Sequence, residues 1–248
     1  MRRLVAVVAA LVVAGCGTSD EGSAPGEVTV FAAASLTESF TSLGKDFEAA
    51  NPGIKVKFNF GGSSALAQQL NQGAPADVFA SAAPANMEQV ADTGTITATP
   101  TTFARNTLQI AVPKGNPGGV GGLADFGKAE LKIALCAEQV PCGAAARKVL
   151  AAAGVTAVPD TLEQDVKAAL TKVSLGEVDA ALVYRTDVKA AGGKVEGKDF
   201  PEAGQAVNDY PIAPVAKARN AAGAQAFIDF VRSEKGRAVL TEAGFVLP

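Results

Sequence analysis

The feature that most constrains this chain is a regular alternation of short β-rich runs with helical stretches from residue 28 onwards. VTVFAA (28–33) has the composition of a buried strand, and the helical pattern near 36–50 ends at the turn NPG (51–53). IKVKFNF (54–60) alternates with a period of two, which is typical of a strand. Helix-length crossovers between strands favour parallel pairing with flanking helices. The sequence therefore predicts an α/β fold of mostly parallel sheets flanked by helices.

The alternation continues to the C-terminus and indicates two lobes. Further strands are expected at 77–80, 108–113, 131–136, 179–184 and 210–215, and further helices at 64–73, from Pro84, and at 143–153, 165–174, 221–233 and 235–243. LQIAVP (108–113) and YPIAPV (210–215) look like a matched pair of strands that link the lobes. We therefore predict discontinuous lobes, the first formed by 28–105 and 211–248 and the second by 106–210.

The N-terminus indicates export. Two arginines precede an apolar run at 4–14, which is far shorter than the roughly 20 residues that cross a bilayer. Residues 1–15 are therefore interpreted as a signal peptide. VAGC (13–16) resembles a bacterial lipobox, which implies lipidation of Cys16; the alternative is an ordinary secretory signal with an incidental cysteine. The polar stretch 16–27 is expected to be a lipid-anchored flexible tether. The folded part then lies outside the cytoplasmic membrane, anchored to its outer face or periplasmic.

Composition excludes several classes of function. The chain has no histidine, which removes the Ser-His-Asp triad, the Cys-His pair and imidazole zinc sites. Its formal net charge is −3, whereas nucleic acid attracts a basic surface. Composition therefore argues against histidine-based catalysis, imidazole zinc sites and a nucleic-acid partner. Together with the resemblance described below, it leads us to expect no catalytic residues, no metal cation and no cofactor.

Cys136 and Cys142 lie six residues apart in a chain predicted to be exported. Thiols oxidise outside the cytoplasm, so a disulfide is the leading interpretation. Such a short loop is stabilised by only about 2 kcal/mol through chain entropy. A metal site is a poor alternative, because two thiolates without histidine leave a tetrahedral shell half empty.

Four places put a small hydroxyl or a free backbone N–H at the start of a predicted helix. They are SLTE (35–38), GGSS (61–64), VPCG (140–143) and EQDV (163–166). Helix N-termini bind anions because their first N–H groups lack intrahelical partners and carry partial positive charge. Strand-to-helix turns also gather at one edge of an α/β sheet. Each place alone has the ordinary interpretation of a cap or turn; only the set indicates an anion site.

The same segments carry a resemblance to a known family. FAAASL (31–36), GSSALA (62–67) and GAPADV (73–78) resemble the periplasmic molybdate-binding proteins of ABC-type uptake systems. The resemblance runs on, in order, through 140–143, 165–167, 182–184 and 210–211, and covers the chain from about residue 28 to its end. It implies a two-lobed periplasmic-binding-protein fold of type II, with the ligand in the cleft between the lobes.

The resemblance also implies a ligand and its site. A tetrahedral oxyanion, molybdate or tungstate, is expected to accept hydrogen bonds from Ser35 and Ser63 in the first lobe and from Cys142, Val166 and Tyr184 in the second. The serines would donate from hydroxyl and backbone N–H, Cys142 and Val166 from backbone N–H, and Tyr184 from its phenol. The family more often has alanine where Cys142 stands, which suggests that a Cys136–Cys142 bridge braces this loop. A monomer that delivers its ligand to a membrane permease is implied.

Three alternatives stay open from the sequence. An exported hydrolase with Ser35 or Ser63 as nucleophile would need a lysine base, and no Ser-x-x-Lys pattern stands at either serine. A lipoprotein that serves as adhesin or scaffold would keep the cleft without using it. A binding protein for another oxyanion, such as sulfate or phosphate, would use the same kinds of donor.

Overall fold

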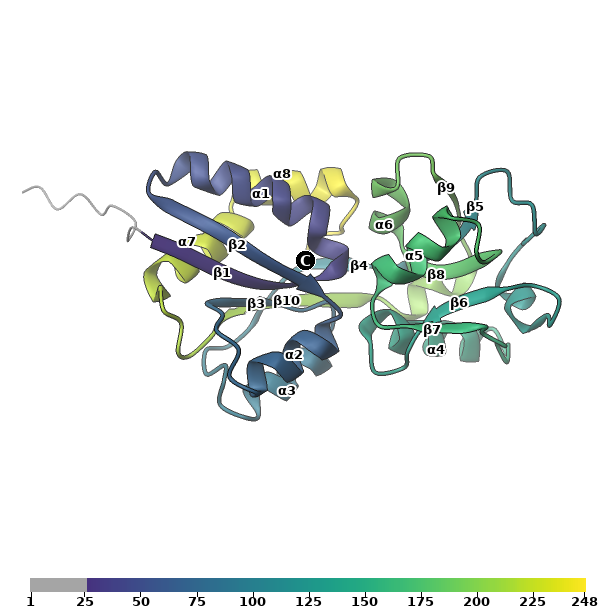
Figure 1. Ribbon diagram of the computed structural model, residues 1–248, viewed down its shortest axis with the longest axis horizontal. Coiled ribbons are helices and arrows are strands. Elements are labelled where there is room, and N and C mark those ends of the chain that lie inside the picture. Colours follow the sequence, from purple (N-terminus) through teal and green to yellow (C-terminus); the bar gives the residue numbers. More distant parts are fainter. Residues whose placement is uncertain (1–25) are drawn as a thin grey trace, which may run out of the picture.

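The computed structural model describes residues 26–248 as two bodies, each built on one five-stranded sheet with helices packed against it (Figure 1). The predicted signal peptide, Cys16 and nearly all of the predicted tether lie outside the described residues. Within residues 26–248, no helix is both long and apolar enough to cross a bilayer. The α/β architecture that the alternation predicts is thus observed.

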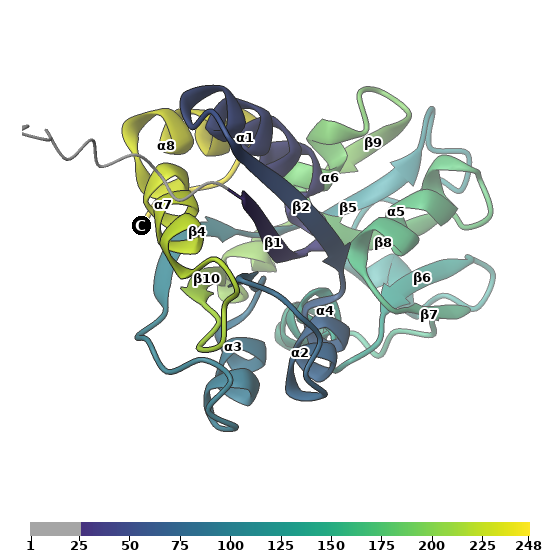
Figure 2. The same cartoon turned by 60° about the vertical axis from the view of Figure 1, so that its left-hand side comes forward.

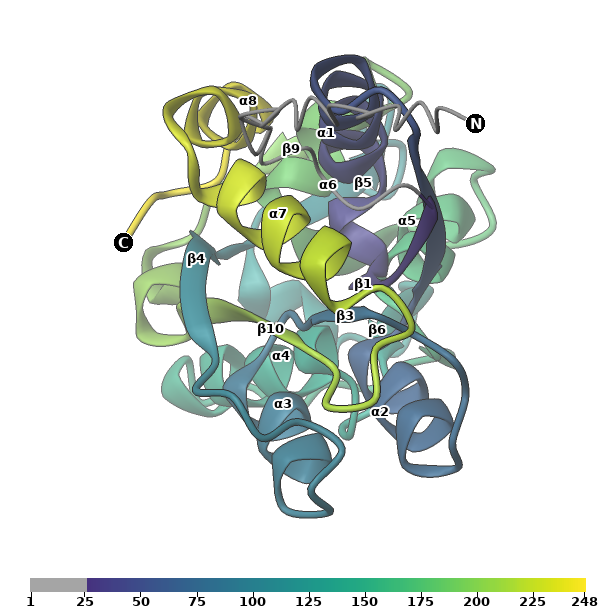
Figure 3. The same ribbon diagram turned by 90° about the vertical axis from the view of Figure 1, so that its left-hand side faces the viewer.

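The first body has the strand order β2-β1-β3-β10-β4. Its strands are β1 (Gly26–Ala33), β2 (Ile54–Gly61), β3 (Val78–Ala80), β4 (Thr101–Asn106) and β10 (Asn208–Pro214). Its helices are the 3-10 turn η1 (Ala34–Leu36), α1 (Thr37–Ala50), α2 (Ser63–Asn71), α3 (Pro84–Ala91), α7 (Ala221–Arg232) and α8 (Glu234–Ala243). Figure 3 shows α1, α7 and α8 on one face of this sheet and α2 and α3 on the other.

The period-two pattern of β1 explains these two layers. Val28 and Val30 are buried on the face where Phe40 of α1 and Phe227 of α7 pack edge to face, with ring centroids 5.9 Å apart. Phe31 is buried on the opposite face, in the cluster under α2 and α3. Burial on both faces of the strand makes β1 the centre of the first core.

The second body has the strand order β7-β6-β8-β5-β9. Its strands are β5 (Leu108–Pro113), β6 (Ile133–Cys136), β7 (Thr161–Glu163), β8 (Ala180–Tyr184) and β9 (Val195–Lys198). Its helices are α4 (Pro141–Ala152), α5 (Val166–Ser174) and α6 (Arg185–Ala190), with 3-10 turns η2 (Leu123–Gly127) and η3 (Pro201–Gln205). In Figure 1, α4 lies on one face of this sheet, and α5 and α6 lie on the other.

Each sheet is half parallel and half antiparallel, so the expected parallel pairs make up one side of each. β1 pairs in parallel with β2 and β3, and β6 with β7 and β8. β10 runs antiparallel to β3 and β4, and β5 antiparallel to β8 and β9. In the first sheet, β10, which returns from the second body, lies between β3 and β4.

The segments 108–113 and 210–215, expected as two strands that link the lobes, lie in different sheets. The first forms β5 in the second sheet, whereas the second lies largely in β10, whose partners are β3 and β4 in the first sheet. The strand β4 (TTFARN) escaped prediction because its composition is polar, and the short β7, β9 and α6 were also not predicted. The chain passes between the sheets at Thr107, which alone separates β4 from β5, and again between β9 and β10. The exact lobe limits stay a prediction.

Candidate functional site

A small cavity lies between the two bodies, where strand ends of the first body face helix starts of the second. The carboxyl end of β2 points toward α5 and β8 in two views (Figures 1 and 2). All five residues predicted to bind a ligand line this cavity: Ser35, Ser63, Cys142, Val166 and Tyr184. The other lining residues are Ala33, Ala34, Gly61, Gly62, Ala82, Val140, Pro141 and Asp165. The space in it for the centre of a water-sized sphere is about 10 Å³, roughly what one water molecule needs, so a ligand that touches both walls must be compact.

Three α-helices begin at the cavity. Ser63 is the first residue of α2, Cys142 the second of α4 and Val166 the first of α5. The backbone N–H groups in the first turn of a helix have no intrahelical partner and carry partial positive charge. Among the described residues that line the cavity there is no lysine or arginine. The positive potential here therefore comes from backbone dipoles and not from side-chain cations.

The two serine hydroxyls have protons available for a ligand. The N–H of Ala82 donates to Ser63 Oγ at 3.0 Å, so the Ser63 hydroxyl acts as acceptor there and keeps its own proton free. Ser35 Oγ lies 2.9 Å from the Tyr210 hydroxyl oxygen. Asn106 Nδ2, which can only donate, lies 3.5 Å from that same oxygen. Tyr210 can therefore accept from Asn106 and donate to Ser35, which leaves the Ser35 proton to point elsewhere.

Tyr184 presents a buried hydroxyl without a partner. Its side chain ends β8 and is 1% exposed, and its hydroxyl oxygen has no hydrogen-bond partner among the described residues. Its ring lies 6.0 Å from that of Tyr210, centroid to centroid. Burial, with the neighbouring Tyr210, raises the pKa of the Tyr184 phenol well above its ordinary value, so the group stays protonated. An unsatisfied buried donor costs about 1–3 kcal/mol, and a ligand oxygen at this place would satisfy it.

Two carboxylates near the cavity are held by other groups. Asp165 lines the cavity as the N-cap of α5, and its Oδ1 accepts a hydrogen bond from Ala168 N at 2.9 Å. Asp187 is fully buried in α6, and its Oδ2 accepts from Tyr184 N at 3.2 Å. Its Oδ1 lies 3.2 Å from Lys167 Nζ. Burial raises the pKa of Asp187 to about 6, against the opposing effect of Lys167.

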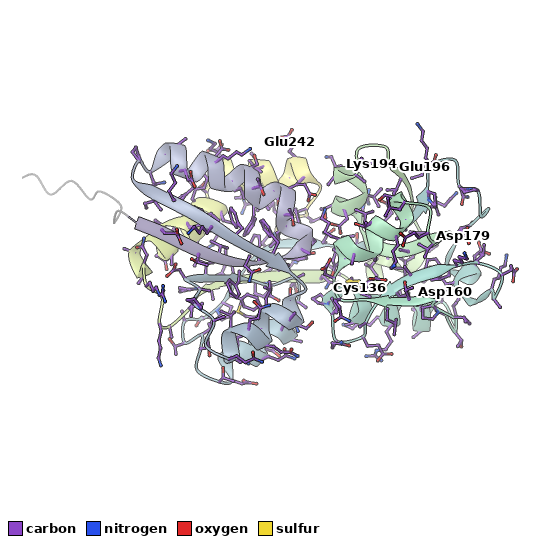
Figure 4. The ribbon with its side chains drawn as sticks, in the orientation of Figure 1. Cys136, Asp160, Asp179, Lys194, Glu196 and Glu242 are labelled. Carbon is purple, nitrogen blue, oxygen red and sulfur yellow. A yellow bond between two sulfur atoms is a disulfide. The ribbon has the colours of Figure 1, made fainter. Side chains whose placement is uncertain are left out.

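The predicted disulfide joins Cys136, the last residue of β6, to Cys142. Figure 4 shows Cys136 on the side of the second body that faces the first. The loop between the cysteines is tied at both ends: Val140 N donates to Ala137 O at 2.9 Å, and Ala137 N donates to Glu163 O at 2.9 Å. The disulfide thus closes the loop that places the Cys142 N–H at the cavity.

Sequence reasoning assigned no role to Tyr210, Asn106 or Asp187, although each contacts a predicted site residue or its partner. One signal was available for Tyr210. The chain has only two tyrosines, and both are buried side by side at this cavity. No sequence pattern marks Asn106 or Asp187, because the strand and helix that carry them were themselves not predicted.

Comparisons of sequence and structure with known proteins place the chain in a family. Residues 28–246 match the family model of the bacterial extracellular solute-binding proteins. The molybdate-binding protein ModA of Mycobacterium tuberculosis is 42% identical over an alignment of 252 positions, which covers 98% of this chain and 97% of the relative. YvgL of Bacillus subtilis, described as a putative ABC transporter substrate-binding lipoprotein, is 32% identical, with 98% and 96% covered. The structure of a periplasmic molybdate-binding protein from Azotobacter vinelandii has a TM-score of 0.78 at 25% identity and covers 89% of this chain and 99% of that one.

Proposed function

Because the chain belongs to the family of bacterial extracellular solute-binding proteins, we propose that it captures molybdate in the cavity between its two bodies. The family and the curated relatives make it a binding protein rather than an enzyme, which sets aside the exported hydrolase. The observation that carries the choice of an oxyanion is the buried Tyr184 hydroxyl, which is protonated, lines the cavity and has no hydrogen-bond partner among the described residues. Its O–H proton needs an acceptor, which an oxyanion supplies.

The proposed binding site is a set of neutral donors. Ser35 and Ser63 contribute hydroxyl and backbone N–H groups, Cys142 and Val166 contribute backbone N–H groups, and Tyr184 contributes its phenol. Molybdate is a dianion with four acceptor oxygens, so donors from both bodies can reach it at once. Hydrogen bonds to an ionised group are about twice as strong as neutral ones, and the helix N-termini offset the buried charge.

Selectivity follows from this chemistry. Sulfate is a smaller tetrahedron and cannot reach every donor, which leaves buried donors unsatisfied at about 1–3 kcal/mol each. The five proposed groups all donate, so hydrogen phosphate, which brings a proton of its own, should bind more weakly. Tungstate is nearly the same size as molybdate and should bind.

We also propose how the protein works in transport. Molybdate closes the two bodies about the connections at Thr107 and between β9 and β10, and a membrane permease accepts the closed form. Lipidation of Cys16 would hold the protein at the outer face of the membrane, a proposal that the name of the Bacillus subtilis relative supports. The protein acts as a monomer.

Isothermal titration calorimetry with molybdate, tungstate, sulfate and phosphate tests the function. We expect heat of binding with molybdate and tungstate, and none with the other two at the same concentrations. Tight binding of sulfate or phosphate in place of molybdate would assign another oxyanion. The absence of heat with all four anions would contradict the oxyanion proposal. It would favour the alternative in which the protein serves as an adhesin or scaffold and does not use the cleft.

A further inference from the structure

A lysine outside the cavity joins the two bodies. Lys167 is the second residue of α5 in the second body, and its Nζ lies 2.8 Å from both carboxylate oxygens of Glu38, in α1 of the first body. The same Nζ lies 3.2 Å from Asp187 Oδ1 in its own body. The Lys167 side chain is only 23% exposed. Of the ion pairs within residues 26–248, Lys167–Glu38 is the only one that connects the two bodies.

Each member of this trio is tied to a proposed donor. Lys167 directly follows Val166 at the start of α5. Asp187 accepts a hydrogen bond from the backbone N–H of Tyr184. Glu38 lies in the first turn of α1, immediately after the 3-10 turn that contains Ser35. The trio therefore connects both walls of the cavity without lining it.

Resting on the function proposed above, we propose that Glu38, Lys167 and Asp187 form a clamp that holds the two bodies closed over the bound anion and sets its rate of release. Lys167 and Asp187 belong to one body and stay paired when the bodies separate, whereas the contact with Glu38 forms only on closure. Asp187 thereby keeps Lys167 charged and aimed at the first body. These are positioning residues, because none of them touches the anion.

The size of the effect follows from the geometry. Exposed ion pairs contribute little, but this lysine is partly buried and both Glu38 oxygens lie within hydrogen-bond distance of it. Loss of the pair should speed release of the anion by about fivefold. Association should change little, since the anion enters the open form, in which the pair is broken.

Stopped-flow measurement of molybdate release tests the clamp. The chain has no tryptophan, so the fluorescence of Tyr184 and Tyr210 at the site reports occupancy directly. We expect Lys167→Met and Glu38→Gln each to raise the dissociation rate about fivefold, and the double variant to exceed neither, because both remove one interaction. Lys167→Arg should restore slow release. The matched control is Lys172→Met, on the same helix, whose partners Glu163 and Glu177 lie in its own body.

Unchanged release in either single variant, or effects that add in the double variant, would overturn the clamp. So would an equal effect of Lys172→Met. If the wild-type chain takes up no molybdate, the proposed function fails, and the clamp is then judged without ligand. In that case small-angle X-ray scattering should give a larger radius of gyration for Lys167→Met than for the wild type, and equal values would overturn the clamp.

Discussion

At the scale of single residues, the cavity combines neutral donors with the carboxylate of Asp165. Asp165 Oδ1 caps its own helix, and Asp187, which does not line the cavity, accepts from a backbone N–H. Lys167, which follows the lining residue Val166, is engaged by Glu38 and Asp187. A bound dianion therefore meets O–H and N–H groups rather than a counter-ion, and its affinity depends on how many of its oxygens are satisfied.

The first prediction concerns two of these donors. Tyr184→Phe and Ser35→Ala should each weaken molybdate binding by about 1–3 kcal/mol, because each removes a donor to a charged group. Calorimetry measures the change in Kd. Ser39→Ala is the matched control: Ser39 is equally buried in the next turn, but its hydroxyl donates to the Leu36 carbonyl and does not line the cavity. Equal losses in the Ser35 and Ser39 variants would contradict the assignment.

The second prediction is a pH dependence of stability due to Asp187. Burial raises the pKa of Asp187 in the folded protein from an ordinary 3.8 to about 6. Between pH 3.8 and pH 6, the folded protein therefore binds a proton here and the unfolded chain does not. The contribution of Asp187 to the free energy of unfolding is therefore most favourable at low pH and is lost as the pH rises through 6. The groups that face it are Lys167, Glu38 and the Tyr184 N–H. Although burial lowers the pKa of Lys167, Asp187 and Glu38 raise it above its ordinary value, so the lysine stays charged throughout.

Denaturant unfolding of the wild type and Asp187→Asn at pH 7 and pH 5 measures this contribution, since all other titrations cancel in the difference. Relative to the variant, the free energy of unfolding of the wild type should rise by about 1 kcal/mol between pH 7 and pH 5. A difference that is the same at both pH values would show that Asp187 titrates normally in the folded protein.

Local sequence signals located the helix starts at the cavity. Glycine, proline and aspartate mark the turns before the helices that carry Ser63, Cys142 and Val166, and this signal is read without knowing the tertiary fold. The roles of these residues as donors come from the family resemblance and stay a prediction. Asn106 and Asp187 could not be found in this way. Asn106 contacts Tyr210, which lies 104 residues away along the chain. Asp187 accepts a hydrogen bond from the nearby Tyr184 backbone. Both residues lie in elements that have no periodic pattern.

At the scale of elements, the start of α2 meets the start of α5 across the cleft. A Cβ atom on Gly62 would lie 2.3 Å from the Gln164 carbonyl oxygen of the second body. Only glycine permits this approach, which brings the N-termini of the two helices to one cavity. The close contact is between the bodies, so it bears on closure rather than on the folding of either body.

The third prediction follows from that contact. Gly62→Ala should weaken molybdate binding about 5- to 150-fold, since a clash with backbone in a closed cleft costs on the order of 1–3 kcal/mol. The melting temperature of the ligand-free protein should change little. Gly61→Ala is the control, because a Cβ there meets only Leu66 at 3.6 Å, an ordinary contact. Similar affinities for the two variants would mean that the bodies do not close this tightly.

The fourth prediction concerns the loop between β6 and α4. Replacing both cysteines, as Cys136→Ala with Cys142→Ala, should lower the free energy of unfolding by about 2 kcal/mol and also weaken molybdate binding. The reason for the second effect is that the disulfide closes the loop that places the Cys142 N–H at the cavity. Thermal unfolding and calorimetry measure the two effects. If both melting temperature and affinity were unchanged, the disulfide would have no bracing role.

At the scale of the whole molecule, strand–helix alternation predicted the α/β class and nearly every helix, but not how the sheets are completed. The segments 210–215 and 108–113 were matched as two linking strands because both are apolar and similar in pattern, but 210–215 lies largely in β10 of the first sheet and 108–113 in β5 of the second. The neighbour of β10, β4, carries threonine, arginine and asparagine, and only the register with β10 reveals it as a strand. Pairing between strands about 100 residues apart is decided by tertiary packing, for which local composition carries little information.

The two bodies, each with its own sheet and core, meet at one small cavity lined from both sides. The central claim is that a molybdate ion bound there is held by Ser35, Ser63, Cys142, Val166 and Tyr184. Anomalous diffraction at the molybdenum absorption edge, from crystals grown with molybdate, locates the metal atom directly. We predict one strong peak at the centre of these five residues, with no lysine or arginine side chain in contact. A peak elsewhere on the protein, or no peak in crystals that contain the ion, would contradict the account.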